Sequence, residues 1–80
     1  MKYVVYVLSS RVVERSYVGS TNNLKRRLEE HNLGKNYYTR RYMPWDVIYT
    51  EEYGSLEIAR KREKMLKSTT GRRYLKKVFA

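Results

Sequence analysis

The sequence predicts an α+β fold with one small sheet and the element order β-β-α-β-α-α. Three observations lead to this prediction. Three short runs are rich in β-branched and aromatic residues, three other segments place apolar residues at helical spacing, and capping residues precede the helical segments. The length of 80 residues suits one compact domain, which we expect to cover residues 1–80.

The expected strands cover residues 3–8, 16–19 and 45–53. Residues 3–8 (YVVYVL) are apolar and mostly β-branched or aromatic, which is typical of a strand buried on both faces. A short polar turn that contains Glu14 and Arg15 follows, so residues 16–19 (SYVG) should return antiparallel to the first strand. Residues 45–53 have strand composition again.

The first expected helix begins after residues 20–23 (STNN), which offer several N-caps in a row. Leu24, Leu28 and His31 then recur at helical spacing. Gly34 is a plausible C-cap, so we expect the helix to end there.

Residues 35–43 are polar, basic and rich in tyrosine without a clear period, so they predict a loop. A second helix should begin at residues 54–55 and run to about Lys67. Residues 70–71 should open a short third helix. Its apolar side is formed by Tyr74, Leu75 and Val78.

The composition excludes several classes of site. The chain contains no cysteine, which excludes disulfides and thiolate metal sites, and its single histidine excludes a zinc centre with several histidines. The apolar run at residues 3–8 is too short to span a bilayer or to form the core of a signal peptide. We therefore expect a cytoplasmic protein without a membrane partner.

The charge favours a polyanionic partner. The chain has 18 Lys and Arg against 8 Asp and Glu, a formal net charge of +10 at pH 7. Nine of the basic residues fall within residues 60–77, where Glu63 is the single acid. Such a concentration predicts a basic face for nucleic acid. An anionic membrane surface, an acidic protein partner or simple solubility are the alternatives.

Two tyrosines and an Arg–His pair are candidates for chemistry. Tyr6 and Tyr17 lie on strands that should pair, which could bring their phenols together, although tyrosine is also simply a good strand residue. Arg27 and His31 share one helix face beside the buried stripe, so Arg27 could cradle a phosphate. The alternatives are a solvated arginine and a buried histidine whose hydrogen bonds are satisfied.

Glu63 is the most informative candidate. It falls on the inward stripe of the second helix with Leu56, Ala59 and Leu66, where an acid is costly unless a cation satisfies it. The cation could be Arg60 or Lys67 on an adjacent turn, or a Mg²⁺ ion, which often takes only one or two carboxylates.

The motifs VVY at 4–6 and YVG at 17–19 resemble the paired motifs of the GIY-YIG nuclease family. Residues 16–32 (SYVGSTNNLKRRLEEHN) and 57–77 (EIARKREKMLKSTTGRRYLKK) are similar to its small stand-alone bacterial members. These in turn resemble the N-terminal nuclease domain of a bacterial excision-repair protein. The match covers nearly the whole chain with consistent spacing.

The resemblance implies a three-stranded antiparallel sheet flanked by helices, with the active site on one face. It assigns catalytic roles to Tyr6, Tyr17, Arg27 and His31, metal binding to Glu63, and a structural role to Gly19 as part of the second motif. Two departures stand out: Val4 replaces the first motif's glycine, and no asparagine follows Asn36, whereas many relatives have one near the end of the domain.

These residues predict a DNA endonuclease that depends on Mg²⁺ (or Mn²⁺) and acts on branched, flapped or single-stranded DNA in repair or recombination. Tyr6, activated by nearby cations, and His31 are competing candidates for the general base. Target selectivity should be weak or come from a protein partner, and the alternative is a non-catalytic nucleic-acid-binding module within a larger complex. The basic residues expected to contact nucleic acid are Lys25, Arg26, Arg40, Arg41, Arg60, Lys64, Lys67, Arg72 and Arg73. Any of Tyr37, Tyr38 and Tyr42 could stack on unpaired bases or pack over the sheet edge.

Overall fold

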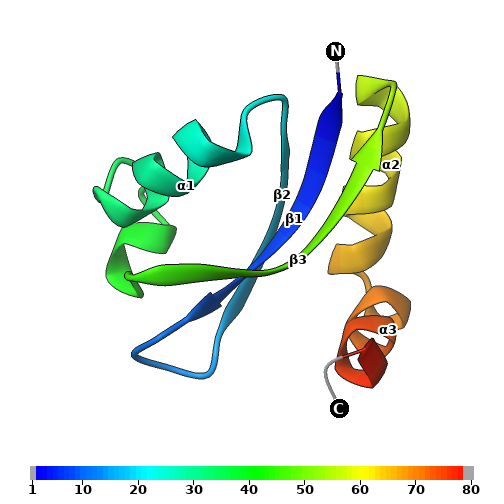
Figure 1. Ribbon diagram of the computed structural model, residues 1–80. Coiled ribbons are helices and arrows are strands. Elements are labelled where there is room, and N and C mark those ends of the chain that lie inside the picture. The colour runs from blue at the N-terminus through cyan, green and yellow to red at the C-terminus, as the bar shows by residue number, and fades with distance from the viewer. Residues whose placement is uncertain (1, 79–80) are drawn as a thin grey trace.

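The computed structural model describes residues 2–78, with side chains for residues 2–77. Its three strands form one antiparallel sheet, as predicted. The strand order is β2-β1-β3, so β1 is the central strand. Helix α1 lies on one side of this sheet, and α2 and α3 lie on the other (Figure 1). The strands are β1 (Tyr3–Ser10), β2 (Ser16–Thr21) and β3 (Trp45–Tyr53). The helices are α1 (Leu24–Asn32), α2 (Leu56–Lys67) and α3 (Thr69–Val78).

Local capping chemistry sets the helix ends. The side chain of Asn23 accepts a hydrogen bond from the backbone N–H of Arg26 at the start of α1, and Ser55 does the same for Ile58 at the start of α2. Gly34 follows α1 with φ of +78°, the left-handed region that favours glycine after a helix. The predicted loop between α1 and β3 contains one short 3₁₀ helix, η1 (Thr39–Arg41).

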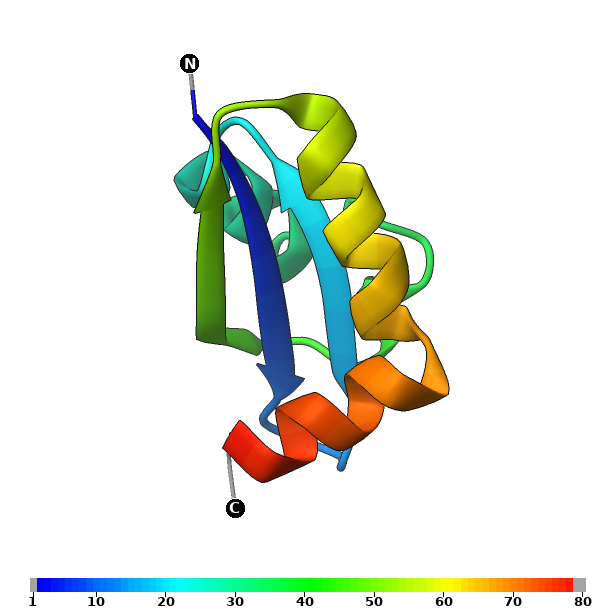
Figure 2. The ribbon, with the colours of Figure 1, turned by 90° about the vertical axis from the view of Figure 1, so that its right-hand side faces the viewer.

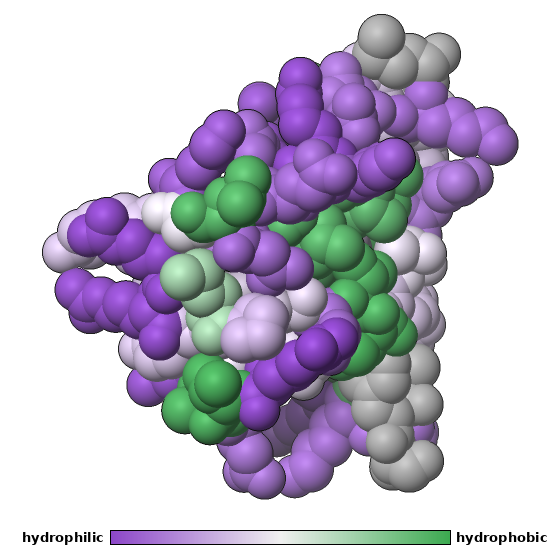
Figure 3. All heavy atoms as spheres, turned by 60° about the vertical axis from the view of Figure 1, so that its left-hand side comes forward, coloured by the Kyte–Doolittle hydropathy of each residue, from purple (hydrophilic) through white to green (hydrophobic). Residues whose placement is uncertain are grey.

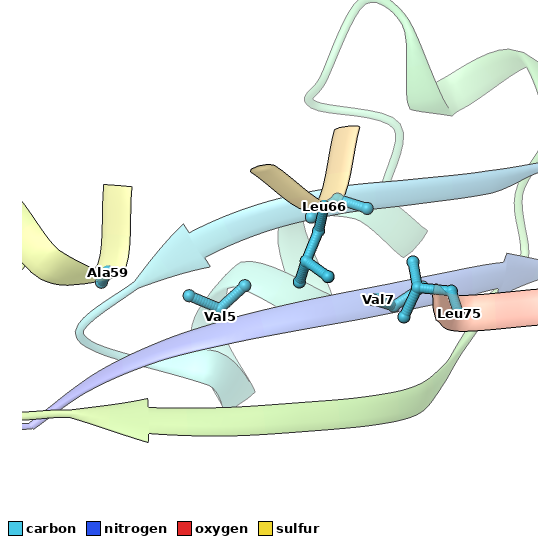
Figure 4. Packing of buried hydrophobic residues seen from close by; sticks show 6 residues of the cluster. Val5, Val7, Ala59, Leu66 and Leu75 are labelled. Carbon is cyan, nitrogen blue, oxygen red and sulfur yellow. The ribbon is translucent and has the colours of Figure 1, made fainter. Parts of the chain in front are cut away.

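Helices α2 and α3 cover one face of the sheet (Figure 2). The core between these layers is small and aliphatic, and Figure 4 shows its side chains converging from the strand and the two helices. Its fully or nearly fully buried members are Val5, Val7, Val18, Ala59, Leu66 and Leu75. At Gly71 a side chain would collide with the backbone of Leu66, so this glycine lets α3 pack closely against the end of α2.

The opposite face of the sheet packs against α1 and the segment that follows it. Tyr6, Leu8 and Trp45 form the buried centre of this second core, and Leu24 and Leu28 of α1 pack against it. The indole N–H of Trp45 donates to the carbonyl of Thr39 over 2.8 Å, which attaches η1 to the sheet. Residues of β1 are therefore buried on both faces, as their composition predicted.

An ionic network attaches α2 to β3. The carboxylate of Glu51 accepts two hydrogen bonds from the guanidinium of Arg62, at 2.7 and 2.8 Å, and others from the hydroxyls of Tyr49 and Tyr53. The Arg62 hydrogen bonds are the largest cause that lowers the pKa of Glu51, to about 2. The network thus stabilises the folded state as long as Glu51 is ionised.

One expectation about the helices is wrong, and another concerns a side chain outside the described residues. Leu56 was expected on the inward stripe of α2, but it is 38% exposed, because the buried contacts of the helix are made by Ala59 and Leu66 in later turns. The side chain of Val78, expected on the apolar side of α3, lies outside the described residues. Within residues 2–78 no helix is both long and apolar enough to cross a membrane.

Candidate active site

Tyr6 and His31 form the buried centre of the site. The hydroxyl of Tyr6 lies 3.1 Å from Nε2 of His31, and both residues are at most 2% exposed. Nδ1 of His31 lies 2.7 Å from Oγ1 of Thr39, a residue of η1 that is fully buried. Strand β1, helix α1 and η1 together hold the imidazole ring between two hydroxyl groups, so its orientation is set by partners on both nitrogens.

Gly19 makes room for the Tyr6 ring. Tyr6 pairs across the sheet with Gly19, and a side-chain Cβ at Gly19 would lie 2.5 Å from the Tyr6 hydroxyl oxygen. Tyr17, two residues away on the same face of β2, packs its ring 6.4 Å from the Tyr6 ring and 5.0 Å from the imidazole of His31. The two tyrosines therefore come together as expected, but the Tyr6 hydroxyl is directed to His31.

Arg27 lies one turn before His31 on α1, and the two residues line a small pocket. The Nε atom of Arg27 is buried and has no hydrogen-bond partner among residues 2–77, although it lies 3.8 Å from a carboxylate oxygen of Glu30. Its side chain is otherwise 43% exposed. Arg27 is therefore only weakly engaged within the chain and can offer donors to an anion in this pocket.

Glu63 is held by two neighbours. Ser20 Oγ donates to one of its carboxylate oxygens over 2.6 Å, and Lys67 Nζ donates to the other over 2.8 Å. Of the two intrahelical cations considered as partners, Lys67 makes the ion pair. Burial pushes the pKa of Glu63 up, but the hydrogen bonds from Lys67 and Ser20 bring this pKa below its ordinary value, so the carboxylate is ionised at neutral pH.

Glu63 approaches edge strand β2 from the side of the sheet opposite to Tyr6. It comes from α2, which covers the face opposite to Tyr6, and it meets edge strand β2 at Ser20, next to Gly19. Its partner Lys67 places Nζ 5.7 Å from the centre of the Tyr17 ring. Both Glu63 and Arg27 act electrostatically on the Tyr6 hydroxyl, in opposite directions. The candidate residues therefore gather around β2, on both sides of it.

Burial sets the protonation of the central pair. It raises the pKa of Tyr6, and Tyr17 adds to this effect while Arg27 opposes it. Activation of the Tyr6 phenolate by nearby cations was expected, but burial outweighs Arg27 and the phenol stays protonated. Burial and Arg27 both lower the pKa of His31 from its ordinary value of 6.5, so the imidazole is neutral at pH 7 and one of its nitrogens is a proton acceptor.

Comparison with known proteins identifies the family of this chain. The GIY-YIG catalytic domain matches residues 2–77. The chain belongs to the GIY-YIG family. Membership in this nuclease family implies nucleic-acid binding, in agreement with the charge of the chain.

Several relatives of this GIY-YIG chain are UPF0213 proteins. One from Natronomonas pharaonis is 40% identical over 67 residues, which cover 82% of this chain and 78% of that protein. One from Streptococcus pyogenes serotype M3 is also 40% identical over 67 residues, covering 82% of this chain and 72% of that protein. The solution NMR structure of a UPF0213 protein from Bacillus halodurans matches 98% of this chain and 85% of its own, with a TM-score of 0.59 and 30% identity.

The chain offers a metal ion one carboxylate. No three His, Asp or Glu side chains among the described residues come close enough together to hold a metal. Glu63 nevertheless fits a hard cation that keeps most of its waters, because its two carboxylate oxygens have more acceptor sites than their two donors use, and a serine hydroxyl lies beside them.

The basic residues that the sequence singled out are all exposed, and hydrophilic side chains cover most of the side of the molecule that carries α1 (Figure 3). They come from α1, η1, α2 and α3. They are Lys25, Arg26, Arg40, Arg41, Arg60, Lys64, Lys67, Arg72 and Arg73.

Two residues of the site were absent from the sequence-based candidates. Ser20, which donates a hydrogen bond to Glu63, follows Gly19 on β2 and therefore faces α2. The alternation of side chains along a strand could have predicted this orientation. Thr39, which orients His31, lies in a segment without periodicity, and no local pattern indicates its partner.

Proposed function

We propose that this GIY-YIG chain is a metal-dependent endonuclease that hydrolyses phosphodiester bonds in branched, flapped or single-stranded DNA, with a role in repair or recombination. Cleavage would leave 5′-phosphate and 3′-hydroxyl ends. The observation that carries the proposal is the hydrogen bond between Tyr6 and a neutral His31, beside the weakly engaged Arg27. These groups can accept a proton from water and donate hydrogen bonds to a phosphate at the same place.

Tyr6 and His31 act as one proton-accepting unit in this proposal. If Nδ1–H of His31 donates to Thr39, then Nε2 accepts the hydrogen bond of the Tyr6 hydroxyl. As the water oxygen bonds to phosphorus, its proton passes to the Tyr6 oxygen while the phenolic proton moves to His31. The bond from phosphorus to the 3′ oxygen breaks, and that oxygen takes a proton from solvent. Tyr6 thus relays the proton without becoming a free phenolate, whose formation its burial opposes.

Arg27 and Tyr17 position the phosphate in this scheme. The buried Nε–H of Arg27 and its terminal N–H groups would donate to the phosphoryl oxygens, on which negative charge grows in the transition state. Tyr17 packs against both Tyr6 and His31 and would orient the attacking water or the phosphate. Gly19 supports this arrangement by leaving space for Tyr6.

Glu63 would hold Mg²⁺ or Mn²⁺, with the hydroxyl of Ser20 beside it. When bound, such an ion polarises the phosphate and stabilises charge on the leaving oxygen. Lys67 neutralises Glu63 within the chain, so it must move aside for the ion.

The test is cleavage of a panel of branched, flapped, single-stranded and duplex DNAs with Mg²⁺ or with EDTA, comparing the wild type with Glu63→Gln. We expect Mg²⁺-dependent cleavage by the wild type, which Glu63→Gln abolishes without loss of DNA binding. End-group analysis should give 5′-phosphates. If the wild type binds DNA but cleaves none of the panel, the chain is a non-catalytic binding module, a function favoured by the Lys67 ammonium at Glu63.

A further inference from the structure

We propose that a pocket beside Tyr17 binds one unpaired nucleotide of the substrate, with its phosphate between Lys67 and Arg72 and its base stacked on Tyr38. The proposal deepens the nucleic-acid binding of the proposed function, but it does not depend on cleavage. In this proposal the chain selects single-stranded or flapped DNA through a nucleotide-binding site next to the proposed catalytic residues.

The pocket lies along the outer edge of β2. Its volume is about 150 Å³, and its lining includes Ser16, Tyr17, Tyr38, Lys67 and Arg72. No described strand pairs with the outer side of β2, so alternate backbone N–H and C=O groups of this edge point outward. A phosphate group fits a pocket of this size. Because Tyr17 also packs against Tyr6 and His31, a nucleotide in the pocket would adjoin the proposed scissile phosphate.

Two cations in the pocket have the charge and freedom to bind a phosphate. The guanidinium of Arg72 makes no hydrogen bond, ion pair or ring contact within residues 2–77, although the chain has several acidic residues. Lys67 is 48% exposed at its side chain and lies between Glu63 and the Tyr17 ring. The Lys67 ammonium donates one of its three N–H groups to Glu63, so its other N–H groups can donate to a phosphate in the pocket.

Of the three tyrosines that follow α1, Tyr38 is the one with no cation over its ring within the described residues. The guanidiniums of Arg40 and Arg41 lie 4.8 and 5.2 Å from the centre of the Tyr37 ring, and Arg15 lies 4.7 Å from that of Tyr42. Among the described residues no cation lies over the ring of Tyr38, which is 46% exposed. Its neighbours Tyr17 and Tyr42 hold it at centroid distances of 6.3 and 5.7 Å.

An aromatic face beside a cationic pocket is the combination that binds single strands. A base stacks on an aromatic ring only when one of its faces is free, and in a duplex the neighbouring base pairs occupy both faces. The proposed binding site therefore discriminates by exposure of the base, while the cations elsewhere on the surface attract single strands and duplexes alike.

The test measures binding without cleavage. A short single strand carrying a fluorescent base analogue, whose emission falls on stacking, is titrated with full-length protein in EDTA, alongside the matching duplex. Tyr38→Leu is compared with Tyr37→Leu, and Arg72→Gln with Arg73→Gln, so each pair matches residue type and charge change. Circular dichroism checks the fold of each variant, and Tyr38→Phe provides a variant that keeps the ring.

We expect Tyr38→Leu to weaken single-strand binding at least about fivefold and to remove the quenching, while Tyr38→Phe retains both. Arg72→Gln should weaken single-strand binding more than Arg73→Gln and lower its salt slope by about 0.7. Duplex binding should respond equally to Arg72→Gln and Arg73→Gln. Equal effects of Tyr38→Leu and Tyr37→Leu on the single strand, or equal losses of single-strand and duplex binding in Tyr38→Leu, would overturn the proposal. Because the assay contains no metal, its outcome is separate from that of the cleavage test.

Discussion

Gly19→Ala is a small change that should disrupt the centre of the candidate site. The added Cβ would lie 2.5 Å from the hydroxyl oxygen of Tyr6, 2.7 Å from the ring carbon that carries it, and 3.1 Å from the Tyr17 ring. Ordinary contacts between such atoms are about 3.5 Å, so the Tyr6 ring must move by about 1 Å. Tyr6 is 2% exposed and packs with Leu8 and Trp45, so a shift of its ring disturbs these contacts.

The expected cost has two parts. Inserting a methyl group into a well-packed interior costs about 1–3 kcal/mol, and loss of the 3.1 Å hydrogen bond between Tyr6 and His31 adds about 1 kcal/mol. The free energy of unfolding should therefore fall by about 2–4 kcal/mol, which corresponds to a Tm lower by roughly 10–30 °C for a chain of this size. Cleavage, measured well below the Tm of the variant, should fall as well, because the proton relay is broken.

The assay is urea unfolding of Gly19→Ala and of the control Gly54→Ala. At Gly54 an added Cβ meets no atom within 4 Å, so the control should unfold within about 0.5 kcal/mol of the wild type. If Gly19→Ala is as stable as Gly54→Ala, the close approach of Tyr6 to β2 is wrong, and with it the placement of the Tyr6 hydroxyl at His31.

Three further predictions concern charge and protonation. The pKa of Glu51 is lowered to about 2, so the ionised Glu51 contributes about 3 kcal/mol to the free energy of unfolding. This contribution is present above the unfolded pKa of 4.5 and is lost as the pH falls toward 2. In thermal melts Glu51→Gln should therefore be less stable than the wild type at pH 7, and its stability should depend less on pH in the acid range. Because the pKa of His31 lies below 6.5, cleavage should decline as the pH falls below that value, and His31→Ala should lower the rate and remove this decline from the pH–rate profile. Arg27→Lys keeps the charge but loses the forked donors of the guanidinium, so single-turnover cleavage should fall at least about tenfold. The free energy of unfolding should change by less than about 0.5 kcal/mol. An unchanged cleavage rate would show that Arg27 is not part of the site.

Capping residues, turn residues and strand composition made several helices and strands predictable from the sequence. The bounds of β3 and the start of α2 after residues 54–55 agree with the sequence-based expectation, because Ser55 caps the helix and the strand lies between a proline and a glycine. Burial of β1 on both faces also followed from its composition. Periodicity was less informative at Leu56, because it shows which residues share a side of a helix but not how far along that helix the partner surface extends.

Contacts between distant segments were harder to predict. Strand pairing, helical spacing and the family resemblance all selected Tyr6, His31 and Glu63, but their partners depend on how α1, η1 and α2 dock on the sheet. The bonds of His31 to Thr39 and of Glu63 to Ser20 join elements with no common local pattern. The sign of the Tyr6 pKa shift depends on burial as well as charge, and composition reports only the charge.

The central claim is that Glu63 serves the reaction as well as the fold, and a matched pair of variants tests it directly. Glu57 lies on the same helix and pairs with Lys61 four residues later, as Glu63 pairs with Lys67. Single-turnover DNA cleavage with Mg²⁺ should be lost in Glu63→Gln and retained in Glu57→Gln, with both variants folded and binding DNA. Equal cleavage by the two variants would contradict the assignment of Glu63 as the residue that holds the metal.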